Sequence, residues 1–234
     1  MEKIENEVTK KDKITIHQII WYLLIFSILG LIVETLFCYA TTGRIESRKG
    51  LIYGPFCPIY GVGATAIIIM LNKFKNSKLK LFIYGGLAGS GIEYIVSYML
   101  EAFYGTRFWN YSHINFNLNG RICILYTFYW AILAFILVKF VKPFIDKKII
   151  SKLNFKILDI TIVILAIIDS ILTVWGINTY RNRAINKYYN KYITNNNVIS
   201  TFENKVFSDE KMKETFPNMR FINENGKEIW IRDL

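Results

Sequence analysis

Residues 81–100 read LFIYGGLAGSGIEYIVSYML, and this stretch decides the class of fold. Its apolar and small side chains run on without the polar face that marks a helix on the surface of a soluble protein. About 20 helical residues, rising about 1.5 Å each, span the hydrocarbon layer of a bilayer, which is about 30 Å thick. One ionisable side chain, Glu93, lies past the middle, where a carboxylate costs a few kcal/mol unless it is paired or faces a polar cavity. The stretch therefore predicts a membrane protein with a polar interior.

The composition supports a membrane protein and argues against several other classes. Of the 234 residues, 53% are hydrophobic and the mean hydropathy is +0.27, which excludes a disordered or fibrous chain. The formal net charge is +11, but Lys and Arg stand between apolar blocks, a pattern that suits the anionic inner leaflet better than a nucleic acid. The three cysteines are too few and too scattered for a disulfide framework or a zinc site. We therefore expect the lipid bilayer as a partner, no nucleic acid, and a place in the plasma membrane.

The apolar blocks predict an all-α, polytopic bundle of about five transmembrane helices within residues 17–177. The five spans are expected at about 19–40, 51–71, 81–100, 121–141 and 157–177. The first is of full spanning length and follows acidic as well as basic residues, so we expect an uncleaved helix after a polar segment, residues 1–16. Pro55 and Pro58 stand at the start of the second span, and they predict an irregular or kinked entry.

Residues 178–234 are expected to form a small, basic and polar C-terminal tail. We predict helices at about 180–193 and 202–215, followed by two strand-like runs around Asn225-Gly226, a pair that suits a tight hairpin turn. The distribution of Lys and Arg over five spans favours a cytoplasmic N-terminus and an external tail, although the basic start of the tail opposes this orientation.

Several polar positions are expected to meet in one half of the membrane, whichever way the chain is oriented. Glu34 lies near the end of the first span, Gly54 near the start of the second, and Arg121 at the start of the fourth; Glu93 and Asp169 reach the same half. Arginine can bridge two carboxylates through its planar fork, so we predict a polar intramembrane cluster of Glu34, Glu93 and Arg121. Three interpretations stay open: ion pairs that only hold helices together, a polar pathway or ligand pocket, and charges that reach the interface.

Cys57, between two prolines, is the side chain that suggests covalent chemistry. A pair with His113 is conceivable, because the loop of residues 104–120 is expected on the same side, but no orienting group is evident. The chain has no GxxxxGK[ST], HExxH or GxSxG string, so it cannot hydrolyse ATP alone by a P-loop mechanism. We expect no enzyme, no catalytic residue, no metal and no cofactor. Gly85 and Gly89 predict close packing between helices.

Four strings resemble one family of membrane proteins. They are GLIYGPFCPIYGVGA (50–64), GSGIEYIVSYMLEAFYGTRFWNYS (89–112), FNLNGRICI (116–124) and, in the tail, FPNMRF (216–221). Over about residues 20–145 the chain is similar to the putative ABC-transporter type IV family, the CmpB-like membrane proteins, and the tail string also resembles members of this family. The resemblance implies a multi-pass, bacterial, permease-like protein, and it marks the following motif positions: Glu34, Gly54, Pro55, Cys57, Pro58, Glu93, Trp109, Asn119, Gly120 and Arg121.

Three functions remain open at this point. The first is a transport component that needs a separate ATPase subunit, or works as a homo-oligomer, and has a water-accessible cavity at the charged cluster. The second is a membrane scaffold or sensor, with a fully packed cluster and a well-formed tail surface for a partner. The third, ranked last, is a membrane enzyme, which requires Cys57 within hydrogen-bonding distance of His113 or a carboxylate.

Overall fold

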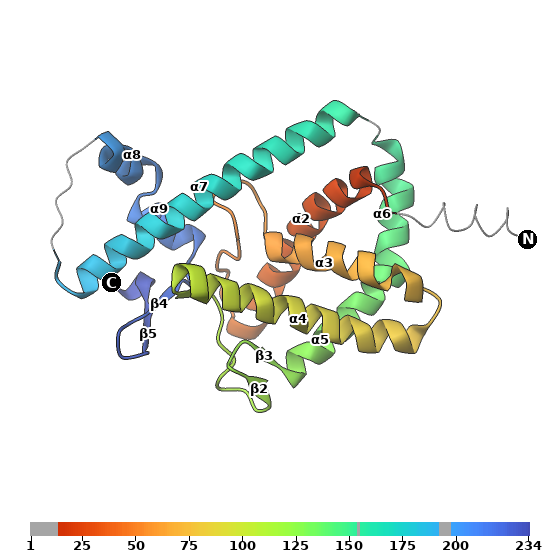
Figure 1. Cartoon of the computed structure of the whole chain (residues 1–234), viewed down its shortest axis with the longest axis horizontal. Helices are drawn as coiled ribbons and strands as arrows, with labels where there is room; N and C mark the ends of the chain where they lie inside the picture. The colour runs from red at the N-terminus through yellow and green to blue at the C-terminus, as the bar shows by residue number, and fades with distance from the viewer. Residues whose placement is uncertain (1–13, 154, 192–197) are drawn as a thin grey trace, which may run out of the picture.

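The computed structural model describes residues 14–153, 155–191 and 198–234, and this part of the chain is mostly helical (Figure 1). The long elements are α2 (Ile16–Thr42), α3 (Pro58–Leu71), α4 (Lys78–Tyr104), α5 (Ile124–Ile136), α6 (Lys142–Lys148) and α7 (Lys156–Tyr188). Short helices join them, namely η1 (Asn72–Phe74), the π-helical η2 (Leu137–Val141) and η3 (Ile150–Lys152). Strands β1 (Thr106–Arg107), β2 (Asn117–Leu118) and β3 (Ile122–Cys123) lie between α4 and α5. The tail adds α8 (Val198–Val206), α9 (Asp209–Thr215), β4 (Arg220–Ile222), β5 (Glu228–Trp230) and η4 (Ile231–Asp233). Of the polar segment predicted for residues 1–16, residues 1–13 lie outside the described part.

Helices α2, α3, α4 and α5 pack against one another in chain order, and glycines bring their backbones close. A Cβ atom added to Gly61 of α3 would lie 2.4 Å from the carbonyl oxygen of Leu23 on α2. A Cβ atom on Gly85 of α4 would lie 2.4 Å from the Cβ of Ala134 on α5, and one on Gly89 would meet the Trp130 ring. The packing role predicted for Gly85 and Gly89 is therefore confirmed. Away from these glycines, the core of the bundle is filled by large apolar side chains that include Trp21, Tyr22, Phe26, Ile67, Ile68, Leu71 and Leu81.

In the described part of the chain, three helical stretches are long and apolar enough to cross a membrane: Ile16–Thr42, Ile124–Lys152 and Lys156–Tyr188. The second joins α5, η2, α6 and η3, so the segment after residue 141 is helical where a basic loop was expected. The helix Pro58–Phe74 is apolar but shorter. Helix α4 has 27 residues, but the glycines, tyrosines and Glu93 in its middle dilute its apolar character, and it is not among the three. The predicted count of about five spans is therefore not confirmed.

The irregular entry predicted before α3 is present. Residues 51–57 form no helix, and α3 begins at Pro58, where the missing N–H of proline costs no helical hydrogen bond. The backbone N–H of Cys57 donates instead to the carbonyl of Ser27 on α2, at 3.0 Å. This bond fixes the loop of residues 43–57, which we call the α2–α3 loop, against the middle of α2.

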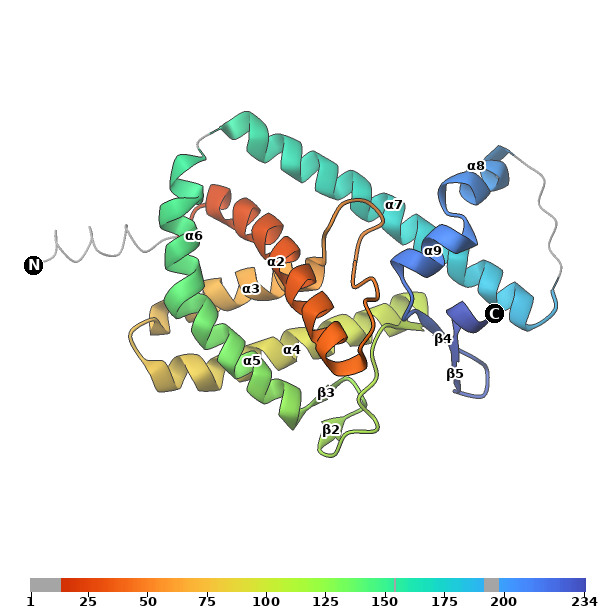
Figure 2. The same ribbon diagram turned by 180° about the vertical axis from the view of Figure 1, so that it is seen from behind.

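Helix α7 lies along one edge of the bundle and links its two ends (Figures 1 and 2). At its start, Asp159 accepts hydrogen bonds from the Trp21 indole at 2.9 Å and lies 2.7 Å from His17 Nδ1, both on α2. Its far end lies beside α9 and the strands of the tail. Because α7 runs unbroken to Tyr188, the predicted boundary at residue 178 falls inside a helix. Of the helix predicted at 180–193, residues 192–193 lie outside the described part.

The tail folds against the membrane domain through a small sheet. Strands β1, β4 and β5 pair antiparallel in the order β1-β4-β5, so the loop after α4 and the tail share one sheet. The predicted hairpin is present, but its loop comprises residues 223–227, and of Asn225-Gly226 only Gly226 has a positive φ, 73°. The single helix predicted at 202–215 is two, α8 and α9, and Ser208 caps the second. Beneath the sheet lies a separate core that includes Ile52, Tyr180, Phe207, Met212, Phe216, Met219, Phe221 and Ile231.

Candidate functional site

A pocket of about 340 Å³ lies where the bundle, the loop between α4 and α5, and the tail meet. We call it the charged pocket, because two carboxylates and two basic side chains line it. Its volume is at the lower end of the range of about 300–1,000 Å³ that is usual for small-molecule sites. The wall from the membrane domain includes Glu34, Cys57, Pro58, Tyr60, Glu93, Trp109, Tyr111 and Trp130, and the remaining wall includes Ser47, Arg48, Lys49, Gly50, Phe216, Pro217 and Asn218.

Glu93 lies deep in the wall of this pocket, with an exposed fraction of 6%. The Tyr111 hydroxyl donates to its Oε1 at 2.8 Å, and the Trp130 indole N–H donates to its Oε2 at 2.9 Å. Tyr111 comes from the loop after α4 and Trp130 from α5, so each carboxylate oxygen is held by a different element. These neutral donors satisfy the hydrogen bonds of a buried carboxylate but do not balance its charge.

Glu34 contributes the second carboxylate, from α2. The Tyr60 hydroxyl of α3 donates to Glu34 Oε2, and the Tyr60 ring lies 6.1 Å from the Trp130 ring, centre to centre. An aromatic wall thus runs from one carboxylate to the other. Within the described ranges, neither Glu34 nor Glu93 lies in an ion pair with a basic side chain.

Arg121, the third member of the predicted cluster, has different partners. Its Nη2 lies 2.6 Å from Glu101 Oε2 and its Nη1 donates to Ser97 Oγ at 3.1 Å, both on α4. Its guanidinium also lies over the rings of Tyr94 and Tyr98, 5.7 and 5.5 Å from their centres. The structure therefore brings Glu34 and Glu93 together at one pocket, whereas Arg121 pairs with a carboxylate two helical turns further along α4.

A chain of charges continues from Arg121 into the tail. Glu101 also accepts from Arg107 Nε at 2.6 Å, and Arg107 Nη1 lies 3.2 Å from Glu228 Oε1 on β5. Arg220 on β4 pairs with the other oxygen of Glu228 at 2.8 Å. Burial of Glu228 opposes its ionisation, but the hydrogen bonds from Arg220 and Asn110 and the charge of Arg107 outweigh it and hold its pKa below the usual value. The ion pair of Arg107 with Glu228 thus links the tail hairpin to the membrane domain.

The basic residues of the charged pocket come from the α2–α3 loop. Arg48 Nη2 donates to the Cys38 sulfur at 2.8 Å and lies 3.7 Å from Glu46, which orients its side chain. Burial lowers the pKa of Arg48, but the hydrogen bond to Cys38 and the negative charges of Cys38, Glu34 and Glu46 outweigh this and raise the pKa, so Arg48 stays charged. Lys49 is exposed, and in the described part no carboxylate lies within ion-pair distance of it.

The motif positions fall into two groups. Cys57, Pro58 and Trp109 line the charged pocket, whereas Asn119 and Gly120 shape the turn that presents Arg121. Trp109 connects the two groups, because its indole N–H donates to the Arg121 carbonyl at 3.1 Å. Asn119 Nδ2 donates to Tyr94 Oη of α4 at 2.9 Å.

The glycines among these positions have backbone conformations with a positive φ. Gly120 has a φ of 66°, and a Cβ atom on it would meet Ser112 Oγ at 2.4 Å. Gly54 has a φ of 68° and precedes Pro55 in the α2–α3 loop. Both positions therefore require glycine for the course of the chain.

Cys57 lines the charged pocket at the start of α3. The hydrogen bonds recorded for it in the described part of the chain involve its backbone, with Ser27 and Tyr60. No group of three or more His, Cys, Asp or Glu side chains in the described ranges is arranged to hold a metal ion.

The sequence analysis missed the charged and aromatic residues of the pocket that matter most for its chemistry: Arg48, Lys49, Tyr60, Tyr111 and Trp130. Tyr60 and Tyr111 stand within the strings that resemble the family, which could have marked them. Trp130 lies outside these strings, and nothing in the sequence marked it. The tail string FPN (216–218) was noticed, but nothing in the sequence placed it at the pocket.

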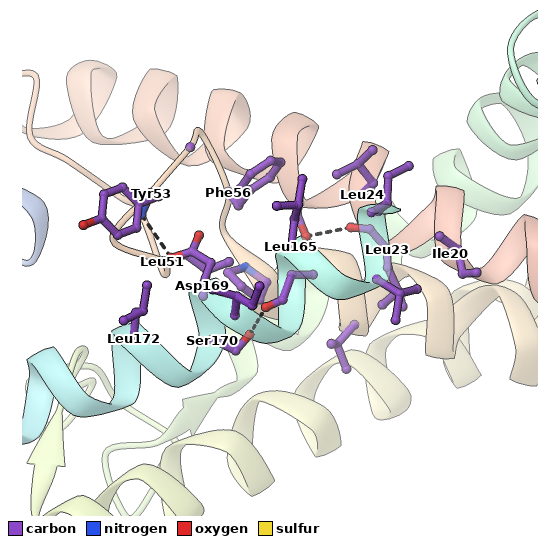
Figure 3. Close-up of a pocket in the computed structure, with 18 residues that line it drawn as sticks. Ile20, Leu23, Leu24, Leu51, Tyr53, Phe56, Leu165, Asp169, Ser170 and Leu172 are labelled. Atoms are coloured by element: carbon purple, nitrogen blue, oxygen red, sulfur yellow. Dashed lines mark hydrogen bonds between the residues drawn. The ribbon is translucent and has the colours of Figure 1, made fainter. Parts of the chain in front are cut away.

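A second, larger cavity of about 710 Å³ lies on the other side of the α2–α3 loop, between α2 and α7 (Figure 3). Apolar side chains such as Leu23, Phe56 and Leu165 line it, and we call it the apolar groove. Asp169 of α7 is among the lining residues, and its Oδ1 accepts the backbone N–H of Tyr53 at 3.2 Å. Asp169 therefore belongs to the apolar groove and not to the charged pocket.

Comparison with known proteins assigns the chain to a family. A family model described as Putative ABC-transporter type IV matches residues 21–174, which is more than half of the chain. The chain belongs to the Putative ABC-transporter type IV family. The match covers α2 to the middle of α7 and thus includes the membrane-domain wall of the charged pocket. Its name and the three apolar helices agree on a membrane protein related to ABC transporters. None of the curated proteins and none of the solved structures gives a significant match.

Proposed function

We propose that this member of the Putative ABC-transporter type IV family is a multi-pass transport subunit of the plasma membrane, permease-like, that works with a separate ATPase subunit. The charged pocket is its substrate site. The observation that carries the proposal is Glu93, a carboxylate with an exposed fraction of 6% that lines an accessible pocket without a basic partner in the described residues. Charged groups held inside a membrane domain commonly mark the path of an ion or a substrate.

The geometry supports a pocket better than a packed ion cluster. A cluster that only held helices together would place Arg121 between the two glutamates, whereas Arg121 is bonded to Glu101 and Ser97. The glutamates are left to a cavity that is lined by five helices of the bundle, by the α2–α3 and α4–α5 loops and by the tail. The proposal gives the chain no catalytic step, and the energy for transport comes from the partner subunit.

A cell-based assay tests this function without knowledge of the substrate. Cells that lack the gene receive the wild-type chain, the Glu93→Gln variant or the Glu210→Gln variant, and their small solutes are profiled by mass spectrometry before and after ATP depletion. Glu210 is exposed on α9, so its substitution is the matched control. We expect the wild type and Glu210→Gln to change the level of the same solutes in an ATP-dependent way, and Glu93→Gln to lose this change. Identical profiles in all strains, with equal amounts of protein, would refute transport.

The alternative is a membrane scaffold or sensor that binds a partner through its tail. The observation in its favour is the separate core of the tail, which joins Phe207, Met212 and Phe221 to Ile52 of the α2–α3 loop. Such a core holds the tail as a firm surface next to the charged pocket. Under this alternative, deletion of residues 198–234 abolishes the cellular phenotype while the Glu93→Gln variant keeps it.

A further inference from the structure

The charged side chains around the charged pocket come from two parts of the chain. The two carboxylates, Glu34 and Glu93, belong to the helices of the bundle, and the two basic side chains, Arg48 and Lys49, belong to the α2–α3 loop. The four formal charges therefore cancel, and the pocket offers groups of both signs to a ligand. A ligand that carries a positive and a negative group at opposite ends matches this division, because each end meets a protein charge of opposite sign.

The aromatic wall favours a particular kind of positive group. The polar atoms of Tyr60, Tyr111 and Trp130 already donate to the two carboxylates, so the faces of the rings are what they can offer a ligand. Aromatic faces attract ammonium groups, and methylated ammonium most of all in cage-like sites. A sugar or another neutral polyol would find few free donors along this wall.

The volume limits the size of the ligand. A pocket of about 340 Å³ suits a ligand of small-metabolite size and is too small for a chain of several residues. Ser47 Oγ donates to the Thr215 carbonyl at 2.8 Å, so the tail lies against the loop that carries Arg48 and Lys49.

We propose that the charged pocket binds a small zwitterion whose ammonium group lies between Glu34 and Glu93, against the aromatic wall, and whose acidic group points toward Arg48 and Lys49. This inference rests on the proposed function, because it names the substrate class of the same site. It narrows the unspecified substrate of that function to small compounds that carry an ammonium group and an acidic group.

Binding to the purified full-length chain in detergent tests the ligand class. Isothermal titration calorimetry is run with glycine betaine, which has both charges, with choline, which has the positive charge alone, and with acetate, which has the negative charge alone. We expect affinity in the order glycine betaine, choline, acetate. Acetate bound as tightly as glycine betaine, or no binding of either ammonium compound in the millimolar range, would overturn the inference.

Variants test each end of the ligand separately. Glu93→Gln and Glu34→Gln should each weaken the binding of glycine betaine and choline about tenfold or more, because a hydrogen-bonded charge contact is lost. Lys49→Gln should lower the affinity for glycine betaine toward that for choline and leave choline binding unchanged. Glu210→Gln and Lys187→Gln, at exposed positions of α9 and α7, are the matched controls for each change of charge. If Glu93→Gln fails to fold, Glu34→Gln still tests the position of the ammonium group. Unchanged binding of glycine betaine to the Glu34→Gln variant would contradict the inference.

The two proposals fail in different ways. Zwitterion binding by the purified chain without any ATP-dependent change of solutes in cells refutes transport and leaves the ligand class in place. ATP-dependent movement of sugars or anions, with no binding of ammonium compounds, refutes the ligand class and leaves transport in place.

Discussion

The backbone N–H of Ile52 donates to Thr173 Oγ1 at 3.0 Å, across 121 residues of sequence. The next residue of the same loop is Tyr53, and its N–H donates to Asp169 Oδ1. On successive turns of α7, Thr173 Oγ1 donates to the same Asp169 Oδ1 at 3.3 Å. Helix α7 therefore supplies the hydrogen-bond acceptors for a loop that has no secondary structure of its own. The loop in turn carries Arg48, Lys49 and Cys57 to the charged pocket, so α7 positions the pocket without forming much of its wall.

Thr173→Val should destabilise the protein by about 1–3 kcal/mol, because the buried N–H of Ile52 loses its acceptor while the shape of the side chain is kept. Thr173→Ser, which keeps the hydroxyl, should cost less. Thermal unfolding in detergent measures both. The control is Thr161→Val, since Thr161 is exposed on α7 and bonds only within its own helix, to Ile157. Equal midpoints for Thr173→Val and Thr161→Val would show that the loop is held by other contacts.

Arg121→Ala should destabilise the fold by about 1–3 kcal/mol, because Arg121 is buried and its loss leaves Glu101 with one basic partner fewer and Ser97 without its bond. The cost stays below that of a fully buried pair, since Glu101 is partly exposed and keeps Arg107. The readout is the unfolding midpoint in detergent, with the exposed Arg44→Ala as the comparison. A midpoint that Arg121→Ala leaves unchanged would mean that the ion chain contributes nothing to stability.

Glu228 should make the docking of the tail dependent on pH. Its pKa is lowered in the folded protein, so its stabilising effect is complete above the ordinary glutamate pKa of 4.5 and is lost as the pH falls through the lowered value. The unfolding midpoint of the wild type should therefore drop on acidification below about pH 4.5 more than that of Glu228→Gln. Glu224→Gln, an exposed change in the same hairpin, should behave as the wild type. Parallel curves for wild type and Glu228→Gln would remove Glu228 from the account of tail docking.

Gly61→Ala should destabilise the protein by about 1–3 kcal/mol, because the added methyl group would lie 2.4 Å from the Leu23 carbonyl oxygen and 2.2 Å from Ser27 Oγ. Backbone contacts of this kind are relieved only by separating α3 from α2. Gly91→Ala is the matched control, since nothing lies within 4 Å of a Cβ atom there and alanine is the better helix former. If both variants unfold at the same temperature as the wild type, the close approach of α2 and α3 is not required for stability.

Several features of the fold could be predicted from the sequence because they depend on local chemistry. Pro58 predicted the start of α3 after an irregular entry, and Asn225-Gly226 predicted the hairpin of the tail. The end of the last long helix could not be predicted in the same way. Residues 178–188 are polar enough to read as a separate tail, but nothing in them breaks a helix, so α7 continues until Tyr189.

The candidate site was predicted only in part. Glu34 and Glu93 were expected to meet, and they line the same pocket, because the alternating direction of α2, α3 and α4 brings the end of one helix to the end of another. The choice of partner for Arg121 could not be read in advance. Glu93 and Glu101 lie two turns apart on the same helix, and only the packing of the loop after α4 decides which of them the guanidinium reaches.

The sequence by itself determined three things: that the chain forms apolar helices suited to a membrane, which family it belongs to, and that two glutamates lie in its interior. Hydropathy and motif strings are properties of the residues alone. The tertiary structure alone decided which charges pair and which are left to a pocket. Ion pairs form over a few ångströms between segments far apart in the chain, and that distance depends on helix packing, on the loop that α7 holds and on the sheet that binds the tail.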